Sequence, residues 1–280
     1  MALCRQTVPL NGFEVIVVDD GCPVALAQRL ASFDSGLSLR LVRIERQGPA
    51  AARNAGAAMA GGRILVFLDD DCVPNPGWLG AYLSAFQQAP DSALVGPVRN
   101  GLPRNVYAEA YHVVLRHLYE FHLPNTGQPE GPTRLPFFPS ANFAVSRNAF
   151  QALGGFEPFF SLTSEDRVFS AKWWRSGHGA LTVPPAEVHH LHALTLHRYL
   201  VQQFQYGRGG MQFRRWLQWT MSQRTGMERF RFYARLLLRT WSDGPLTRRP
   251  ALFLLVMLSQ VALALGHARE ALTKPRRQCS

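Results

Sequence analysis

The sequence predicts an α/β protein with a mostly parallel sheet flanked by helices and a basic helical extension at the C-terminal end. Two observations predict this fold. Apolar β-rich runs alternate with helical runs through the first half of the chain. The runs 13–18 and 64–68 also end in clustered acidic residues, and open α/β folds bind their ligands at the carboxyl ends of their strands. With 280 residues, of which 47% are hydrophobic, the chain can bury a substantial core.

Each element follows from local composition. Strands are expected where apolar and β-branched residues run together, at 13–18, 39–44, 64–69, 94–95 and 142–145. Helices are expected at 24–33, 49–61, 76–88, 105–121, 147–153 and 165–176. The helix at 49–61 begins with a proline in its first turn and closes at two glycines. The stretch 123–139 is rich in proline and glycine and predicts a loop.

The character of the chain changes after residue 185, where histidines cluster and a basic, aromatic helical stretch follows to about residue 241. We therefore expect three parts: an α/β domain over 1–195, a basic helical region over 196–245, and an apolar helix with basic flanks over 246–280. The apolar run 250–266 has seventeen residues, whereas about 20 are needed to cross a bilayer. A short membrane-embedded helix and an in-plane or domain-packed helix are both consistent with this length.

The net charge of +11 bounds the possible partners. Nucleic acid, anionic lipid and phosphorylated substrates would each explain it. Aromatic residues interleave with arginine between 204 and 241, and on an amphipathic helix this pattern also fits a membrane surface, so nucleic acid is the weaker interpretation. The four cysteines are dispersed without metal-binding spacing, and the first residues show no secretory signal. These features predict a cytoplasmic protein at the inner face of the cell membrane.

Three adjacent carboxylates, Asp69, Asp70 and Asp71, end the apolar run Ile64–Leu68. Such a cluster favours a cation, because like charges a few ångströms apart repel. In an extended segment Asp69 and Asp71 would share one face, with Asp70 on the other. Their oxygens suit Mg²⁺ or Mn²⁺. The alternative is a polar strand-to-loop transition that caps the helix near Trp78.

Four motifs occur in a fixed order: Glu14–Gly21, Gly48–Gly56, Phe67–Asp71 and Ser164–Asp166. Together they resemble the nucleotide-sugar-dependent glycosyltransferases of family 2, which have the GT-A fold, over most of residues 12–210. The resemblance implies an inverting, metal-dependent transfer of a sugar from a UDP- or GDP-sugar to a hydroxyl. The acceptor would be a lipid-linked molecule or a polysaccharide, and the cofactor would be Mn²⁺ or Mg²⁺.

The resemblance also implies roles for residues that face the donor nucleotide. Asp19 and Asp20 would meet the nucleobase or ribose, with an Asx turn before Gly21 as the alternative. Arg53 would bind the diphosphate, because a guanidinium near a helix start favours anions; a surface arginine is the alternative. Asp70 is expected on the nucleotide side of the same site.

The metal is assigned to the Asp69 and Asp71 pair, with Asp71 in direct contact and Asp69 acting as a ligand or through ribose or water. His190 follows at the spacing of a family histidine that ligates the metal or contacts the diphosphate, and a buried structural histidine is the alternative. Arg208, within the motif Tyr206–Gly209, would reach phosphate, unless the motif is a helix-ending turn.

Asp166 is implied to be the base that removes the acceptor proton, and Glu165 would help to place it or contact acceptor hydroxyls. Simple capping of a helix start is the alternative. Asn142 is assigned to sugar hydroxyls. Trp173 offers a sugar-stacking face, with a place in the core as the alternative.

One departure from the family concerns the start of the chain. Family members open with an additional strand and helix, and Met1–Gln6 looks like the last turns of that helix. We expect either a start assigned too late or a protein that lacks this unit. A truncated, inactive relative that serves as a membrane or partner adaptor and a nucleotidyltransferase are the rival functions.

Overall fold

The computed structural model describes residues 2–23, 26–31, 36–122, 135, 137–160, 163–222, 230–242 and 246–273. The chain forms two compact units. The first, here called the α/β unit, comprises Met1–Gly101, His122–Ser161 and Glu165–Leu191; the second, the helical unit, comprises Leu102–Phe121, Leu162–Ser164 and His192–Ser280. The predicted boundary at 195 therefore differs from this division, since the 105–121 helix groups with the C-terminal helices. The expected loop at 123–139 lies largely outside the described residues.

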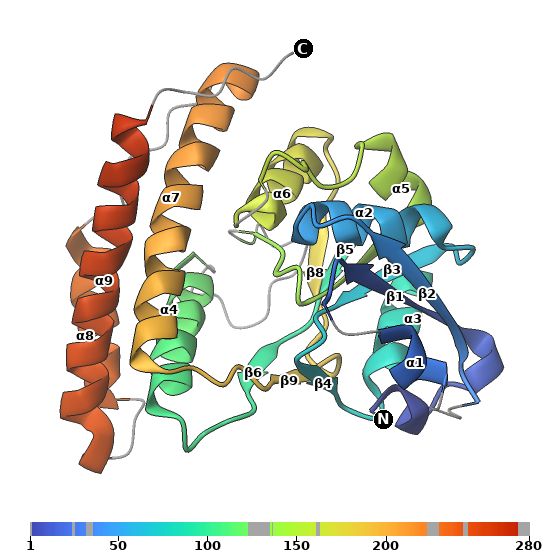
Figure 1. Ribbon diagram of the computed structural model, residues 1–280, viewed down its shortest axis with the longest axis horizontal. Helices are drawn as coiled ribbons and strands as arrows, with labels where there is room; N and C mark the ends of the chain where they lie inside the picture. The colour runs from blue at the N-terminus through green and yellow to red at the C-terminus, as the bar shows by residue number, and fades with distance from the viewer. Residues whose placement is uncertain are drawn as a thin grey trace. The chain divides into compact units, whose positions relative to one another are not determined.

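The α/β unit follows the predicted alternation of strands and helices (Figure 1). Its strands are β1 (Glu14–Asp20), β2 (Ser38–Ile44), β3 (Ile64–Leu68), β4 (Cys72–Pro74), β5 (Ala93–Val95), β6 (Val98–Asn100), β7 (Asn142–Ser146), β8 (Ala180–Thr182) and β9 (Val188–His190). Its helices are α1 (Leu26–Ala31), α2 (Pro49–Met59), α3 (Trp78–Gln88), α5 (Arg147–Ala152) and α6 (Glu165–Arg175), and short 3₁₀ turns occupy η1 (Leu3–Arg5) and η2 (Leu10–Gly12).

The strands form three sheets, two of which contain both parallel and antiparallel pairs. β1 pairs with β2 in parallel, β3-β7-β5-β8 forms the central sheet, and β4-β9-β6 forms a small third sheet. The α/β class was predicted correctly, but the mostly parallel sheet was not, because β7 runs antiparallel to both β3 and β5. Strand and helix alternation implies parallel neighbours only when a short crossover joins them. The chain reaches β7 after the long excursion through α4 (Val106–His122), which does not fix the strand direction.

An aromatic core joins the central sheet to helices α5 and α6. The rings of Phe67 and Phe143 stack at 4.9 Å between centroids across the β3–β7 pair. Phe150 and Phe169, from α5 and α6, pack on the same cluster. Figure 1 shows α2, α5 and α6 gathered on one side of the strands. The helix α6, which carries the predicted base in its first turn, is therefore anchored by Phe169 to this aromatic core.

The helical unit contains α4, α7 (Leu196–Met221), α8 (Phe230–Ser242), η3 (Leu246–Arg248) and α9 (Arg249–Leu272). α7 packs along α9 (Figure 1). A Cβ atom on Gly207 would lie 2.0 Å from the Leu263 carbonyl oxygen, and one on Gly266 would lie 2.0 Å from that of Phe204. Only glycine permits this approach of two helices. Because the motif Tyr206–Gly209 lies inside α7, the helix-ending turn considered for it was wrong.

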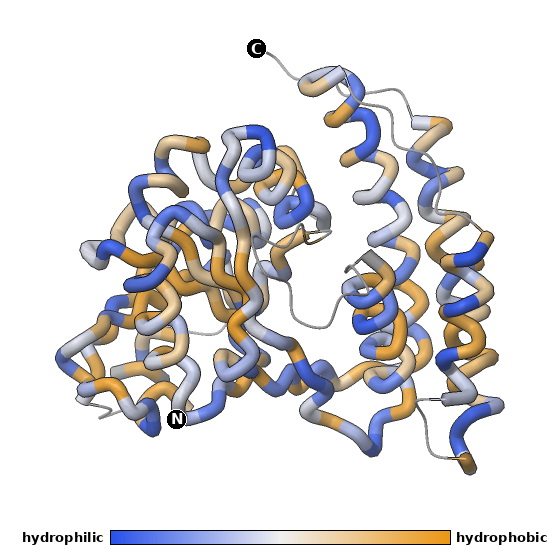
Figure 2. Tube along the Cα trace, turned by 180° about the vertical axis from the view of Figure 1, so that it is seen from behind, coloured by the Kyte–Doolittle hydropathy of each residue, from blue (hydrophilic) through white to orange (hydrophobic). Residues whose placement is uncertain are grey.

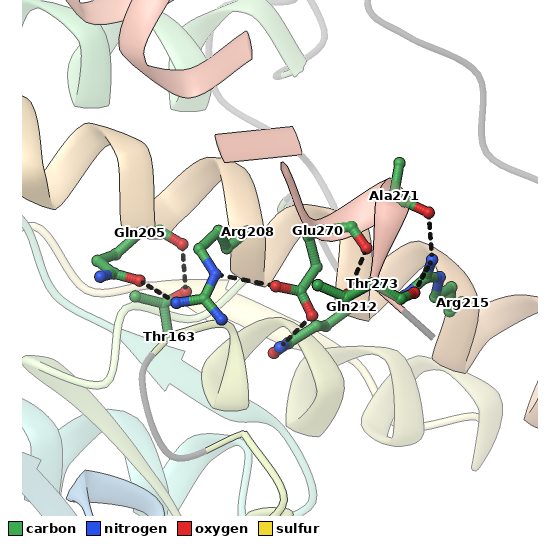
Figure 3. Close-up of polar contacts among 8 residues, drawn as sticks. All are labelled: Thr163, Gln205, Arg208, Gln212, Arg215, Glu270, Ala271 and Thr273. Carbon is green, nitrogen blue, oxygen red and sulfur yellow. Dashed lines mark hydrogen bonds and ion pairs between the residues drawn. The ribbon is translucent and has the colours of Figure 1, made fainter. Parts of the chain in front are cut away.

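A polar network closes the α7–α9 contact near the C-terminal end of α9 (Figure 3). Glu270 accepts hydrogen bonds from Arg208 Nε at 2.9 Å and from Gln212 Nε2 at 2.8 Å. Burial favours a raised pKa for Glu270, but the hydrogen bonds from Gln212 and Arg208 outweigh it and lower the pKa. Arg215 donates to the carbonyl oxygens of Ala271 and Thr273. Arg208 therefore forms an ion pair that joins the two helices, and its phosphate contact stays a prediction.

Candidate active site

The acidic cluster that follows β3 is divided between two partners. β3 ends at Leu68 and a turn follows, in which the Cys72 amide donates to the Asp69 carbonyl oxygen at 3.1 Å. The side-chain alternation expected for an extended Asp69–Asp71 segment therefore does not apply. Asp70 is exposed, whereas Asp69 and Asp71 are partly buried. The turn sends Asp69 toward α2 and Asp71 toward β9.

Arg53 joins the acids of two distant motifs. From α2, its Nη2 donates to Asp69 Oδ1 at 2.6 Å and its Nη1 donates to Glu165 Oε1 at 2.9 Å. Burial alone would lower the pKa of Arg53, but the charges of Asp69 and Glu165 raise it. The guanidinium also faces the Phe156 ring at 5.9 Å. Arg53 is therefore a built component of the site rather than the surface arginine considered as the alternative.

α6 begins directly at the two predicted catalytic acids. Glu165 is buried and pairs through Oε1 with Arg53, while Asp166 is half-buried. Asp166 Oδ1 accepts a hydrogen bond from the Arg167 amide at 2.8 Å. Burial, followed by the charge of Glu165, raises the pKa of Asp166 to about 7. A carboxyl in this range changes charge near neutral pH, which suits a general base.

The two residues before α6 are held in place by α7, within the helical unit. Ser164 is buried and has φ of +77°, a left-handed conformation that is unfavourable for a residue with a side chain. Thr163 Oγ1 donates to the Gln205 carbonyl oxygen at 3.3 Å. A Cβ atom on Gly209 would lie 1.9 Å from Thr163 Oγ1. Gly209 therefore leaves the space that this strained connection to Glu165 occupies.

Asp71, Cys72 and His190 form a cluster of metal-ligand type. The β4–β9 register sets Cys72 opposite His190, and His190 Nε2 lies 3.1 Å from Asp71 Oδ2. One ligand atom from each of the three residues lies within 4.8 Å of the others. Burial and the charges of Asp69, Asp71 and Asp70 raise the pKa of the Cys72 thiol to about 12. A carboxylate and an imidazole fit a divalent cation that keeps other positions for water and phosphate.

Of the predicted metal set, Asp71 and His190 lie together, whereas the carboxylate of Asp69 pairs with Arg53. Metal binding by any of the three stays a prediction. Cys72 was missed because a lone cysteine carries no metal-binding spacing. The signal that was available is its place directly after Asp71, at the start of a short strand.

Asp19 and Asp20 organise the segments that follow β1 and β2. Asp19 Oδ1 accepts from the Cys22 amide, three residues further along the chain, at 2.7 Å, whereas an Asx turn uses the amide two residues on; its Oδ2 pairs with Arg43 at 3.2 Å. Asp20 accepts from the amides of Gln47 and Gly48, at 2.7 and 2.8 Å. Gly48 has φ of +94° and directly precedes α2. Asp20 therefore fixes the loop that leads to Arg53, and Asp19 fixes the turn after β1; a nucleotide contact by either stays a prediction.

Asn142 and Trp173 are corrected to core residues. The side chain of Asn142 is fully buried; its Oδ1 accepts from Trp78 Nε1 and Tyr82 Oη, and its Nδ2 donates to the carbonyl oxygens of Pro97 and Ala186. These four bonds use the whole capacity of the amide. Trp173 is also fully buried and donates from Nε1 to the Gly179 carbonyl oxygen. Neither side chain is open to a sugar.

Comparison with known proteins identifies the family. The sequence profile of glycosyl transferase family 2 matches residues 2–154. The chain belongs to this family. Solved structures of similar fold include the mannosyltransferase PcManGT from Pyrobaculum calidifontis in complex with GDP-Man and Mn²⁺, at 19% identity and a TM-score of 0.62 over 97% of this chain and 81% of that one. GalNAc-T7 with UDP, GalNAc and Mn²⁺ matches at 18% identity and a TM-score of 0.53 over 69% of this chain and 40% of that one. These likenesses show the predicted GT-A fold.

Among relatives in sequence, validoxylamine A glucosyltransferase from Streptomyces hygroscopicus subsp. jinggangensis is 31% identical over 180 residues, which cover 62% of this chain and 41% of that protein. Pre-mycofactocin glycosyltransferase from Mycobacterium tuberculosis is 31% identical over 211 residues, 73% of this chain and 43% of that protein. Polypeptide N-acetylgalactosaminyltransferase 15 from Mus musculus is 31% identical over 196 residues, 64% of this chain and 30% of that protein. The chain therefore spans less than half the length of each of these relatives.

Proposed function

We propose that this family 2 member transfers a sugar from a nucleoside diphosphate sugar, with UDP- and GDP-sugars as the candidate donors, to a hydroxyl of a lipid-linked or polysaccharide acceptor. The observation that carries the proposal is the double contact of Arg53, which binds Asp69 at the end of β3 and Glu165 at the start of α6. The contact supports a single site that includes the strand-end acids and the predicted base. The names of the relatives, all glycosyltransferases, support the same reaction class.

Asp166 is the base in this proposal. The acceptor oxygen attacks the anomeric carbon, its proton passes to the Asp166 carboxylate, and the bond between the anomeric carbon and the diphosphate oxygen breaks. A single displacement from the face opposite the leaving group inverts the anomeric configuration. The raised pKa of Asp166 supports this role, because a base with a pKa near the working pH is both available and basic enough to take a proton.

Asp71 and His190 would hold the divalent cation, Mn²⁺ or Mg²⁺. When bound, such a cation supplies positive charge that makes a nucleoside diphosphate a better leaving group. PcManGT and GalNAc-T7 were both determined with Mn²⁺. Arg53 would hold Asp69 and Glu165 in position at the same site, since its guanidinium is hydrogen-bonded to both carboxylates.

The test is incubation with UDP-, GDP- and dTDP-sugars plus Mn²⁺, with released nucleotide as the readout. Wild-type protein should release nucleotide with at least one donor when a suitable acceptor is present, and Asp166→Asn should lose transfer while calorimetry still detects donor binding. Asp91→Asn, at an exposed acid of the same unit, is the matched control. If calorimetry detects no binding of nucleotide in the presence of metal, the chain is an inactive relative and the proposal is wrong.

A further inference from the structure

The outward face of α9 has the inverse of the pattern expected for a helix in water. A surface helix normally turns charged and polar residues outward. On α9, the exposed large hydrophobic side chains follow one another at spacings of 3, 1, 3, 4 and 7 residues: Leu254, Met257, Leu258, Val261, Leu265 and Leu272. Among the described residues of the helix, Arg269 near its C-terminal end is the one exposed charged side chain. No Asp, Glu, Lys or Arg stands between Arg249 and Arg269. Figure 2 shows hydrophobic positions along most of α9.

The other face of α9 is already occupied within the helical unit. Leu252 and Val256 are fully buried, and Gly266 meets the backbone of α7. The outward stripe is therefore a second apolar face on a helix that has satisfied its packing against α7 and α8. In the part of the chain that the structure describes, nothing covers this stripe, and a contiguous exposed apolar surface of this kind indicates a binding surface.

The charge around the stripe indicates what binds there. Across 230–242 and 246–273 the sequence has six arginines and one acidic residue, Glu270, which is buried and paired with Arg208. Arg231, Arg235 and Arg269 are exposed. Trp241 is half-exposed and contacts Phe253 of α9. An apolar stripe on a unit that also exposes arginines and a tryptophan fits the boundary between acyl chains and anionic headgroups.

The helix that packs against α9 indicates whether α9 lies on a bilayer or crosses it. By length and composition, the helix Leu246–Leu272 is the only one in the described residues that passes as a membrane span. α7 runs parallel beside it, since Tyr199 Oη donates to the Leu255 carbonyl oxygen and Gln212 reaches Glu270. α7 carries Arg198, Gln202, Gln205 and Arg208 along this length. If α9 crossed the bilayer, α7 would bring these polar groups into hydrocarbon, which is strongly unfavourable.

We propose that the α8–α9 face binds the surface of a bilayer with anionic headgroups, with α9 lying in the membrane plane and its stripe at the acyl boundary. Such binding would place the protein at the surface where a lipid-linked acceptor is found. This link to the acceptor rests on the proposed function. Binding itself requires no catalysis.

The test is flotation of the full chain with phosphatidylcholine vesicles that contain or lack phosphatidylglycerol, at two salt concentrations. We expect binding to the anionic vesicles that weakens with salt. The triple variant Leu254→Gln, Val261→Gln, Leu265→Gln should bind at least about tenfold more weakly. The control Met59→Gln with Val201→Gln changes residues of similar exposure outside the stripe and should bind as wild type. Circular dichroism checks that each variant is folded.

Three results would overturn the proposal. The first is equal vesicle binding by wild type and triple variant. The second is a wild-type dimer in light scattering that the triple variant converts to monomer without any change in vesicle binding, which would make the stripe an interface between copies. The third is a graded series of membrane depths for probes on Leu254→Cys, Val261→Cys and Leu265→Cys, which would show a helix that spans the bilayer. The depths are measured by depth-dependent quenching, with accessible native cysteines replaced by serine. Equal depths for the three probes would support the in-plane helix. Asp166→Asn should bind vesicles normally, so failure of docking and failure of catalysis remain distinct.

Discussion

Arg53 Nη1 lies 2.9 Å from Glu165 Oε1, a contact that links two residues 112 positions apart. The second nitrogen of the same guanidinium holds Asp69. One largely buried cation therefore serves two carboxylates from different motifs. Removing it would leave both acids without their counterion inside the protein, and an unpaired buried charge costs far more than an exposed pair contributes.

Arg53→Met should therefore lower the free energy of unfolding by about 3 kcal/mol, measured by urea denaturation at neutral pH. Arg99→Met is the matched control, because Arg99 pairs with Glu187 at 3.0 Å with more than half of its side chain exposed. Its loss should be below about 1 kcal/mol. Equal losses for the two variants would show that the Arg53 bridge is a surface pair in solution.

Asn142→Ala should act on stability rather than on sugar recognition. It removes the shared partner of Trp78, Tyr82 and two backbone carbonyls, and buried groups left without a hydrogen bond are costly. We expect a loss of about 3 kcal/mol in urea denaturation, whereas Asn11→Ala, at an exposed position, should change little. The donor affinity of the folded fraction should be unchanged. If the variant were as stable as wild type but bound the donor more weakly, the original assignment of Asn142 to sugar hydroxyls would be supported instead.

From the sequence we predicted which acidic residues lie at the site, but not which side chains they contact. Placing Asp69 at a strand end and Glu165 at a helix start required only local patterns, and the same was true of an arginine early in the 49–61 helix. The pairing of Arg53 with Asp69 depends on the turn at 69–72, which follows no periodic pattern. Similarly, Asn142 is a polar residue at a strand end, and no local signal distinguishes a buried amide from a ligand-binding one.

The elements that were missed are short strands with distant partners. β4 and β9 have three residues each and pair residues near 72 with residues near 190, so neither shows the alternation by which strands are recognised. This pairing places His190 at Asp71. The role of Tyr206–Gly209 was also missed, because a glycine that permits helix contact and a glycine that ends a helix look alike until the partner helix is known.

The metal cluster makes a prediction about ligand type. Asp71→Asn and His190→Ala should each weaken Mn²⁺ binding at least about tenfold in calorimetry, while Asp91→Asn should not. Cys72→Ser should leave Mn²⁺ affinity nearly unchanged and weaken Cd²⁺ binding, because a thiol is a soft donor. Loss of Mn²⁺ affinity in Cys72→Ser, or its retention in Asp71→Asn, would contradict this ligand assignment.

Gly209→Ala should disturb catalysis through the residues before α6. The new methyl group would collide with Thr163 and press on Ser164, whose strained backbone leads directly into Glu165. We expect kcat to fall at least about tenfold and the free energy of unfolding to fall by about 2 kcal/mol. Gly80→Ala, inside α3 with only ordinary contacts at 3.6 Å or more, should leave kcat unchanged and keep or improve stability. If stability falls but kcat is normal, the role of Gly209 is confined to the packing of the helices.

Because the pKa of Asp166 is raised, the catalytic rate should increase with pH while the contribution of this group to stability should decrease. Since the base acts when deprotonated, kcat/KM should rise with pH and level off above about 7, and Asp166→Asn should lower kcat at least about 100-fold. Asp91→Asn should keep the wild-type profile.

For stability, the folded state holds the Asp166 proton more tightly than the unfolded chain, whose carboxyl titrates near the ordinary value of 3.8. The contribution of this group is therefore greatest below pH 3.8 and is lost as pH rises through about 7. Asparagine does not titrate, so the stability of Asp166→Asn relative to wild type should increase between pH 4 and pH 8, in urea denaturation at each pH. A relative stability that decreases over this range would show that folding lowers the pKa of Asp166, and a base poised near neutral pH would then be excluded.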